Sequence, residues 1–346
     1  NEGVHRLGIG EYSNKDEYID RLHHEYKVIT KLGWTDYFLV VERIIAEAKK
    51  RYGHITGDYT VGHGRGSAAG SLVSWCLGIT DCDPIKYGLL FERFISEDRG
   101  DCPDIDLDFH SVVKDNIKDI IVDLFGEEKV CSIGTYSKYK TKAVILDVAR
   151  VLALDVKEAN RVTKQLESLT SFESGGVEDI VDNLPFSEIC KHYGDLKKYF
   201  EENPEVEEYA GIFRNQIRNM STHAGGVIIS DNPLTDKIPI LRDKSGNIIS
   251  AWAESGSTAE LSTVGLVKFD LLGLRNLDVM ADCIKLVEET RGIKLNKSKI
   301  PVDSRDAIEK ESKHDFVGIF QLENPSTKAV VDQIGVNSLN DIAAVT

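Results

Sequence analysis

The 346-residue sequence lacks several features that would assign it to a class of protein at once. No apolar run approaches the ~18 residues of a membrane-spanning helix, and the polar start of the chain is not typical of a secretory signal. The six cysteines include no Cys-x-x-Cys pair, which disfavours a zinc site and is typical of reduced thiols. No internal repeat is present. We therefore expect a cytoplasmic protein of two or three domains, with no membrane partner.

Charge is distributed unevenly along the chain. The formal net charge of −15 by itself disfavours a nucleic-acid partner. Residues 138–165, however, carry seven positive and three negative side chains, a net of +4. Residues 166–210 carry twelve acids and three lysines, a net of −9. Such a run is usually a solvated face, but the basic segment is also suited to phosphate contacts.

Hydrophobic periodicity predicts a mixed chain of α-helices and β-strands, in which a helical segment separates two parts that contain strands. We expect helices over residues 15–51, 68–77, 112–125, 138–168, 212–219 and 276–291. We expect extended segments over residues 58–61, 89–95, 104–109, 226–230 and 265–270.

Two aspartates one residue apart, Asp104 and Asp106, are the most informative local feature. In a β-strand they project to one side, while the apolar residues that alternate with them face a core. Neighbouring carboxylates repel each other unless a cation lies between them. Two Mg²⁺ ions, ~3.5–4 Å apart as in phosphoryl transfer, would suit such acids. A charged edge strand that prevents aggregation is the alternative.

A glycine-rich turn, Gly62-His63-Gly64-Arg65-Gly66-Ser67, precedes the aspartates. A strand, a tight turn and a helix with small residues can present backbone N–H groups to an anion. The Walker pattern is absent, because no Gly-Lys-Ser/Thr follows. The turn does match the loose dinucleotide form GxGxxA, which keeps a dinucleotide-dependent oxidoreductase as a remote alternative. A plain tight turn is equally compatible with the residues.

Basic residues and a third acid complete the set. Arg93 and Arg99 lie shortly before Asp104, and guanidinium groups bind phosphate oxygens in bidentate fashion. Lys268 and Asp270 are two residues apart on a later strand and share a face. Asp270 is therefore a candidate third carboxylate. Ion pairs with nearby acids, or a surface salt bridge, are the alternatives for these residues.

Four sequence blocks occur in the order and at the separations of one known family. They are GRGSAAGSLVSWCLGITDCDPIKYGLLFERFISEDRGDCPDIDLDF, THAGGVIIS, GLVKFDLLGLRNL and GIFQLE. The chain resembles bacterial replicative DNA polymerases of the C family, the DNA polymerase III alpha subunits, over nearly its whole length. The resemblance implies an α/β palm like that of DNA polymerase beta nucleotidyltransferases, with an inserted helical thumb. The implied domains are palm over 1–112, thumb over 113–205, palm again over 206–275, and the start of the fingers over 276–346.

The resemblance also assigns roles to residues. It implies that Asp104, Asp106 and Asp270 bind two Mg²⁺ ions, and that Asp108 is secondary. The implied contacts to the incoming triphosphate or the primer end come from Gly66, Ser67, Arg93, Arg99 and Lys268. The implied contacts to primer–template DNA come from four basic residues spaced one helical turn apart in pairs, Lys138 with Lys142 and Lys157 with Arg161. His223 lies in a family motif, where we expect it to be packed or hydrogen-bonded.

The implied activity is templated DNA synthesis from dNTPs, in a bacterium or a phage-infected one. His63 stands where the family commonly has proline, and the sequence stops before most of the fingers. We therefore expect a catalytic fragment or one part of a split polymerase that works with other replisome polypeptides. A DNA-binding or assembly module that is inactive alone is the alternative.

Overall fold

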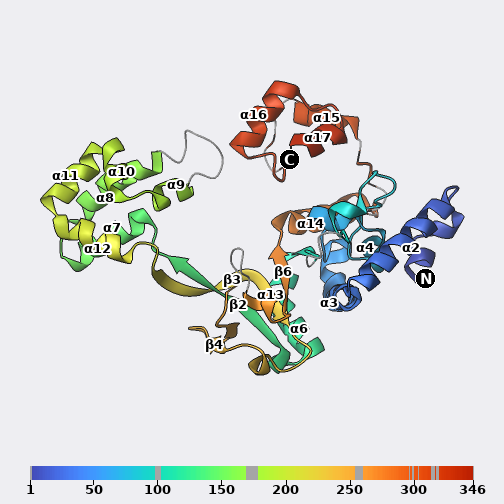
Figure 1. Ribbon diagram of the computed structural model, residues 1–346. Helices are drawn as coiled ribbons and strands as arrows, with labels where there is room; N and C mark the ends of the chain where they lie inside the picture. The colour runs from blue at the N-terminus through green and yellow to red at the C-terminus, as the bar shows by residue number, and fades with distance from the viewer. Residues whose placement is uncertain are drawn as a thin grey trace. The chain divides into compact units, whose positions relative to one another are not determined.

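Two compact units make up the chain in the computed structural model, which describes residues 2–97, 103–168, 178–253, 260–295, 297, 300–302, 304–312, 316 and 319–345. Unit 1 combines residues 1–130 with 268–346, and unit 2 comprises residues 131–267. Figure 1 labels helices and strands in both. The predicted mixed α/β composition is confirmed.

Unit 1 is mainly helical and contains one pair of parallel strands among its described residues. Its α-helices are α1 Glu2–Arg6, α2 Lys15–Lys31, α3 Thr35–Thr56, α4 Leu72–Leu77, α5 Ser111–Lys114, α6 Ile117–Phe125, α14 Arg275–Arg291, α15 Arg305–Ser312, α16 Pro325–Ile334 and α17 Leu339–Val345. Its 3₁₀ helices are η1 Ile9–Glu11, η2 Gly57–Tyr59, η3 Gly66–Gly70, η4 Phe91–Arg93 and η5 Glu127–Lys129. The strands are β1 Asp106–Phe109 and β6 Val267–Gly273.

The two strands of unit 1 are anchored by apolar side chains on one face. Leu107 and Phe109 of β1 are buried, while the aspartates that alternate with them are partly exposed. The ring of Tyr37, from α3, stacks on Phe269 of β6 at 5.1 Å between centroids. The hydroxyl of Tyr37 also accepts a hydrogen bond from the backbone N–H of Ile105 at 3.2 Å. One side chain thus fixes both strands against α3 and leaves their other face to the carboxylates.

Unit 2 contains a helical cluster and a group of strands. The strands β2 Val130–Lys138, β3 Ile217–Ile229, β4 Ile240–Arg242 and β5 Ile248–Ser250 lie in the order β3-β2-β5-β4. The helices are α7 Thr141–Val151, α8 Val156–Lys164, α9 Glu178–Asn183, α10 Phe186–His192, α11 Gly194–Glu202, α12 Pro204–Phe213 and α13 Glu260–Thr263, with 3₁₀ helices η6 Gln165–Ser168 and η7 Leu234–Asp236. The helical cluster has its own buried core, which includes Val144, Leu196 and Val206.

Most long helices are confirmed, but three local predictions are wrong. Residues 212–219 are not a helix, because α12 ends at Phe213 and Asn215 has a positive φ of 66° before β3 begins. Residues 58–61 form a 3₁₀ turn and a single β-bridge, because α3 continues to Thr56 and leaves little chain to extend. The helix expected from residue 68 begins only at Leu72, after η3.

Two further expectations hold only in part. Residues 89–95 contain η4, and the helical stretch expected from residue 138 starts only after β2 ends there. Gly78 takes the left-handed conformation directly after α4, where this helix ends. No helix among the described residues combines the length and the apolar character needed to span a membrane.

Candidate active site

Three carboxylates come together where β1 and β6 lie side by side. The strands are parallel, and their register pairs Asp106 with Asp270. Residues paired in this way project to the same face of a sheet, and Asp104, two residues before Asp106, follows the same alternation. One carboxylate oxygen from each of the three residues lies within 4.8 Å of the others. The sequence prediction that these three acids converge is therefore confirmed as geometry.

The burial of the three carboxylates differs. Asp104 is exposed, whereas the side chains of Asp106 and Asp270 retain 28% and 15% of their accessible surface. Oδ1 of Asp270 is buried and has no hydrogen-bond partner among the described residues, and Oδ2 lies 2.9 Å from Nζ of Lys268. A buried carboxylate oxygen without a donor is costly in water-free surroundings. The donor set of three carboxylates suits a hard cation such as Mg²⁺.

The glycine-rich turn lies directly beside the carboxylates. On β1, the carbonyl of Asp108 accepts a hydrogen bond from the N–H of Gly62 at 2.8 Å, and Val61 forms a β-bridge with Phe109. Gly66 has a φ of +67°, and the position a Cβ would take there is 3.7 Å from Oδ2 of Asp106. Glycine adopts that conformation without strain. The turn that the sequence suggested for anion binding is therefore adjacent to the acids.

Arg65 joins the glycine turn to the acids, and sequence reasoning gave it no role. Its Nε lies 3.9 Å from Oδ2 of Asp106, and its Nη1 lies 3.6 Å from Oδ1 of Asp108. Burial raises the pKa of the Asp108 carboxyl, an effect that Arg65 opposes and the charge of Asp106 reinforces. The signal that could have identified Arg65 was a lone cation inside a glycine turn, shortly before a run of acids.

The other predicted nucleotide contacts are distributed as follows. Ser67 follows Gly66 in η3 and is exposed, and Arg93 is exposed in η4, which lies beside η3. Lys268 forms the ion pair with Asp270 described above. Arg99 lies outside the described residues. Gly66 and Lys268 thus lie against the carboxylates, whereas for Ser67 and Arg93 the structure shows exposure on neighbouring turns.

The predicted DNA-contacting residues all belong to unit 2. Lys138 is the exposed last residue of β2 and Lys142 lies in the first turn of α7, so the expectation that they are one helical turn apart is wrong. Lys157 and Arg161 do lie four residues apart on α8. Arg161 pairs with Asp195, its Nη1 lying 3.2 Å from the carboxylate Oδ2.

Two further expectations concern other side chains. His223 is hydrogen-bonded as expected: its Nδ1 accepts from the backbone N–H groups of Gly225 and Gly226, at 3.2 and 2.7 Å. Cys76, Cys82, Cys190 and Cys283 are free thiols. Neither feature contributes to the cluster of acids.

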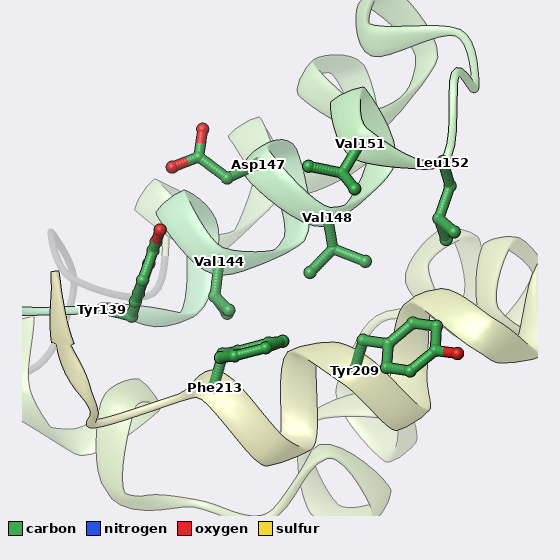
Figure 2. Close-up of a pocket in the computed structure, with 8 residues that line it drawn as sticks. All are labelled: Tyr139, Val144, Asp147, Val148, Val151, Leu152, Tyr209 and Phe213. Atoms are coloured by element: carbon green, nitrogen blue, oxygen red, sulfur yellow. The ribbon is translucent and has the colours of Figure 1, made fainter.

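Unit 2 also has a groove between α7 and α12, shown in Figure 2, with a volume of about 460 Å³. It is lined by Tyr139, Val144, Asp147, Val148, Val151, Leu152, Tyr209 and Phe213. The carboxylate of Asp147 is already engaged by Arg150 and Arg218, at 2.7 and 2.8 Å. The groove therefore offers apolar surface and no group suited to catalysis.

Comparison with known proteins supports the resemblance found in the sequence. The family model for the bacterial DNA polymerase III alpha NTPase domain matches residues 2–273, and that for the alpha subunit finger domain matches residues 276–346. The DNA polymerase III subunit alpha of Staphylococcus aureus (strain COL) is 37% identical over 336 residues, 96% of this chain and 29% of the relative. That of Staphylococcus epidermidis is 35% identical over 343 residues, 99% of this chain and 30% of the relative. The chain spans less than a third of the length of these relatives. It belongs to the C family of bacterial DNA polymerases, that of the DNA polymerase III alpha subunits.

Proposed function

We propose that this chain carries the nucleotidyl-transfer site of a templated DNA polymerase. The observation that carries the proposal is the in-register pairing of Asp106 with Asp270, which brings three carboxylates together, one oxygen from each within 4.8 Å of the others. Two bound Mg²⁺ ions would activate a primer 3′-hydroxyl and stabilise the leaving pyrophosphate. Asp104, Asp106 and Asp270 would hold them. The structure offers no candidate general base within this cluster other than the carboxylates themselves, and we assign none.

The groups around the acids are suited to a triphosphate. The turn at Gly66 and Ser67 presents main chain to an anion, and Lys268 supplies a cation beside Asp270. Arg93, exposed on η4, and Arg99 are the proposed guanidinium contacts. Together these groups would orient the dNTP for in-line attack, which converts binding energy into correct alignment of the reacting atoms.

Unit 2 would contribute contacts to the primer–template duplex. Lys138, Lys142, Lys157 and Arg161 would bind phosphates without reading the base sequence. Because Arg161 is paired with Asp195, we expect Lys157→Gln to weaken DNA binding more than Arg161→Gln does. In domain terms we propose palm over 1–112 and 206–275, an inserted thumb over 113–205, and the start of the fingers over 276–346. Other replisome polypeptides are the proposed partners.

Primer extension tests the proposal. The chain is mixed with a primer–template, the complementary dNTP and Mg²⁺, first alone and then with a polypeptide that carries the remaining fingers. We expect Asp270→Asn and Asp104→Asn to abolish incorporation and to leave DNA affinity unchanged. Asp108→Asn is the matched control, because this acid shares the face of β1 but lies outside the triad. Incorporation by the triad variants at the wild-type rate would refute the assignment.

The same experiment separates the second candidate function, a module that binds DNA but needs another chain for catalysis. Incorporation only after the second polypeptide is added, still abolished by Asp270→Asn, would favour one part of a split polymerase, whereas incorporation that Asp270→Asn leaves intact would favour the module. Incorporation by the chain alone would exclude it. The absence of NAD binding in calorimetry would eliminate the oxidoreductase that the GxGxxA pattern left open.

A further inference from the structure

A buried ion pair on α2 connects to the two turns that carry the proposed triphosphate contacts. Glu25 is completely buried, and its Oε1 lies 2.7 Å from Nε of Arg21, one helical turn earlier. A buried carboxylate is tolerated only when its oxygens are paired and hydrogen-bonded. The partners of Glu25 are therefore informative about what the pair does.

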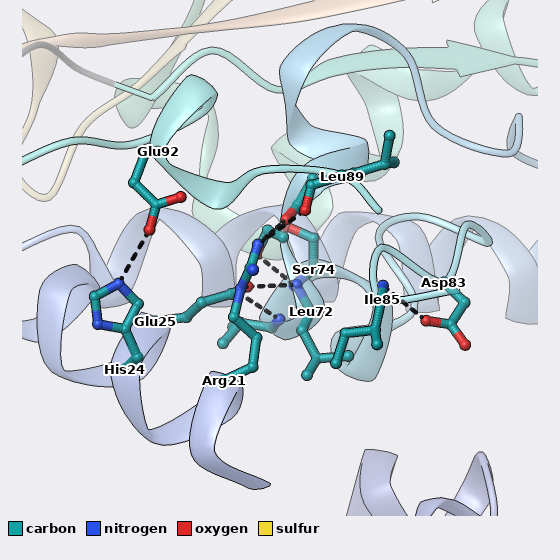
Figure 3. Close-up of polar contacts among 12 residues, drawn as sticks. Arg21, His24, Glu25, Leu72, Ser74, Asp83, Ile85, Leu89 and Glu92 are labelled. Carbon is teal, nitrogen blue, oxygen red and sulfur yellow. Dashed lines mark hydrogen bonds and ion pairs between the residues drawn. The ribbon is translucent and has the colours of Figure 1, made fainter. Parts of the chain in front are cut away.

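Glu25 holds the beginning of α4, the helix that follows the glycine-rich turn. Its Oε1 accepts from the N–H of Leu72 at 3.0 Å, and its Oε2 accepts from the N–H of Val73 at 3.0 Å and from the hydroxyl of Ser71 at 2.9 Å. These N–H groups are the first of α4, which have no partner inside the helix. Figure 3 shows the side chain of Glu25 extending from α2 towards Leu72. A side chain from another helix thus caps α4.

Arg21 extends the same network to a second segment of chain. Its Nη2 donates to the carbonyl of Gly70 at 3.1 Å and to the carbonyl of Leu89 at 3.2 Å. Gly70 is the last residue of η3, which begins with Gly66 and Ser67, and Leu89 lies just before η4, which ends with Arg93. One guanidinium therefore ties together the ends of the two turns.

The end of η3 and the chain just before η4 approach each other so closely that only glycine fits at their contact. A Cβ on Gly70 would lie 2.7 Å from the carbonyl oxygen of Leu90. This close contact and the shared guanidinium hold η3 and η4 in one arrangement. Because catalytic groups displaced by about 1 Å can lose on the order of 100-fold in rate, the spacing of these turns matters for binding a triphosphate.

We propose that Arg21 and Glu25 are positioning residues for the incoming nucleotide: they set the separation between the Gly66–Ser67 turn and Arg93 and do not themselves touch the substrate. The inference rests on the proposed function. It adds that the affinity for dNTP, and not the affinity for DNA, depends on a pair buried on α2. The hydrogen bonds of the pair are concentrated on these segments. Glu25 accepts from four donors, on Arg21 and at the start of α4, and Arg21 donates to two carbonyls, one at the end of η3 and one just before η4.

Two variants test the positioning role. Glu25→Gln keeps the shape of the side chain but places an amide N–H₂ where backbone N–H groups now donate. Arg21→Lys keeps the positive charge and leaves the contacts of Glu25 with α4 in place, but it removes the Nη2 group that donates to both carbonyls. A matched control is Glu47→Gln, because Glu47 and Arg51 form the same i,i+4 pair on α3, at 2.8 Å, without reaching either turn.

The readout is a stalled complex of the chain, with the second polypeptide if extension requires it, on a primer–template that ends in a dideoxynucleotide. We expect Glu25→Gln and Arg21→Lys to raise the Kd for the complementary dNTP by about tenfold, while the Kd for primer–template stays within about twofold. Glu47→Gln should change neither constant. Hydrogen exchange at the amides of Leu72 and Val73 should accelerate in Glu25→Gln and remain slow in Arg21→Lys.

The outcomes separate the two proposals. Wild-type dNTP affinity in Arg21→Lys, in a chain that remains folded, would overturn the positioning role and leave only a structural cap. A parallel rise in the Kd for dNTP and for DNA would also overturn it, because it would indicate a general loss of structure. If Glu25→Gln does not fold, Arg21→Lys decides the question alone. Failure of the wild-type complex to bind dNTP would instead refute the proposed function itself.

Discussion

Replacing Asp270 with asparagine should separate the stability of the chain from its affinity for Mg²⁺. The carboxylate of Asp270 is repelled by that of Asp106, at no more than 4.8 Å, by about 3.5 kcal/mol at an effective dielectric constant of ~20. The exposed Asp104 adds about 0.9 kcal/mol at the dielectric constant of water. The attraction of Lys268 at 2.9 Å contributes about 5.7 kcal/mol in the opposite direction.

The attraction of Asp270 to Lys268 and its repulsion from Asp104 and Asp106 nearly cancel, so removing the charge of Asp270 has a small net effect. Without metal, we therefore expect Asp270→Asn to lower the free energy of unfolding by only about 1 kcal/mol, the difference between the lost attraction and the relieved repulsion. With Mg²⁺ at 100 times its Kd, the wild-type chain should gain about 2.7 kcal/mol. If the variant binds Mg²⁺ at least about 100-fold more weakly, its gain at the same concentration falls to about 0.4 kcal/mol.

Urea unfolding followed by tryptophan fluorescence measures both quantities. Trp34 and Trp75 lie in unit 1 and Trp252 lies in unit 2, so a Trp252→Phe background makes the signal report unit 1. Titrations with and without Mg²⁺ are compared for Asp270→Asn and for the control Asp108→Asn, which should keep the full gain. An equal Mg²⁺-dependent gain in Asp270→Asn and in the parent would refute the metal assignment.

Three other predictions concern groups away from the carboxylates. Burial, reinforced by the charge of Lys297, lowers the pKa of His63, so below about pH 6.5 the unfolded chain binds more protons than the folded chain. The free energy of unfolding should therefore decrease less steeply on acidification in His63→Gln than in the wild-type chain. An unchanged dependence of this free energy on pH, measured by urea unfolding from pH 5 to 8, would contradict the prediction. Burial raises the pKa of Cys76 to about 11, so its alkylation by iodoacetamide at pH 8 should be far slower than that of the exposed Cys283, as peptide mass spectrometry can show; equal rates would disprove it. Leu196→Ala, at a fully buried position of α11, should destabilise unit 2 by about 2–5 kcal/mol in denaturation followed by circular dichroism, and a loss below about 1 kcal/mol would indicate that the core collapses around the gap.

The triad was predictable because its signals are local and repeated. The alternation of aspartates with apolar residues in β1 fixes which side chains share a face, and the same period of two places Lys268 and Asp270 together on β6. What sequence alone did not supply is the pairing of the two strands in parallel register. The resemblance to a known family implied only that the three acids act together, and the structure brings them within reach of one another.

The features that were missed depend on contacts between distant segments. Glu25 looks like an ordinary charged residue of an amphipathic helix, because its partners are backbone groups that any sequence would carry. Arg65 contacts Asp106 and Asp108 only because the glycine-rich turn packs against β1, which the sequence does not reveal. The helix predicted over 212–219 fails for a different reason, since Arg214, with a ψ of 136°, already leaves the helical conformation and Asn215 follows with a positive φ, which local propensity did not reveal.

The parallel pairing of β1 with β6 has a consequence for synthesis of the chain. Asp104 and Asp106 leave the ribosome long before Asp270, because all of unit 2 is translated between the two strands. At 5–20 residues per second, the interval is on the order of ten seconds. During that time β1 lacks its parallel neighbour, so the nascent chain has two of the three acids that later converge. The cluster of acids can therefore form only after the intervening unit has been translated and has had time to fold.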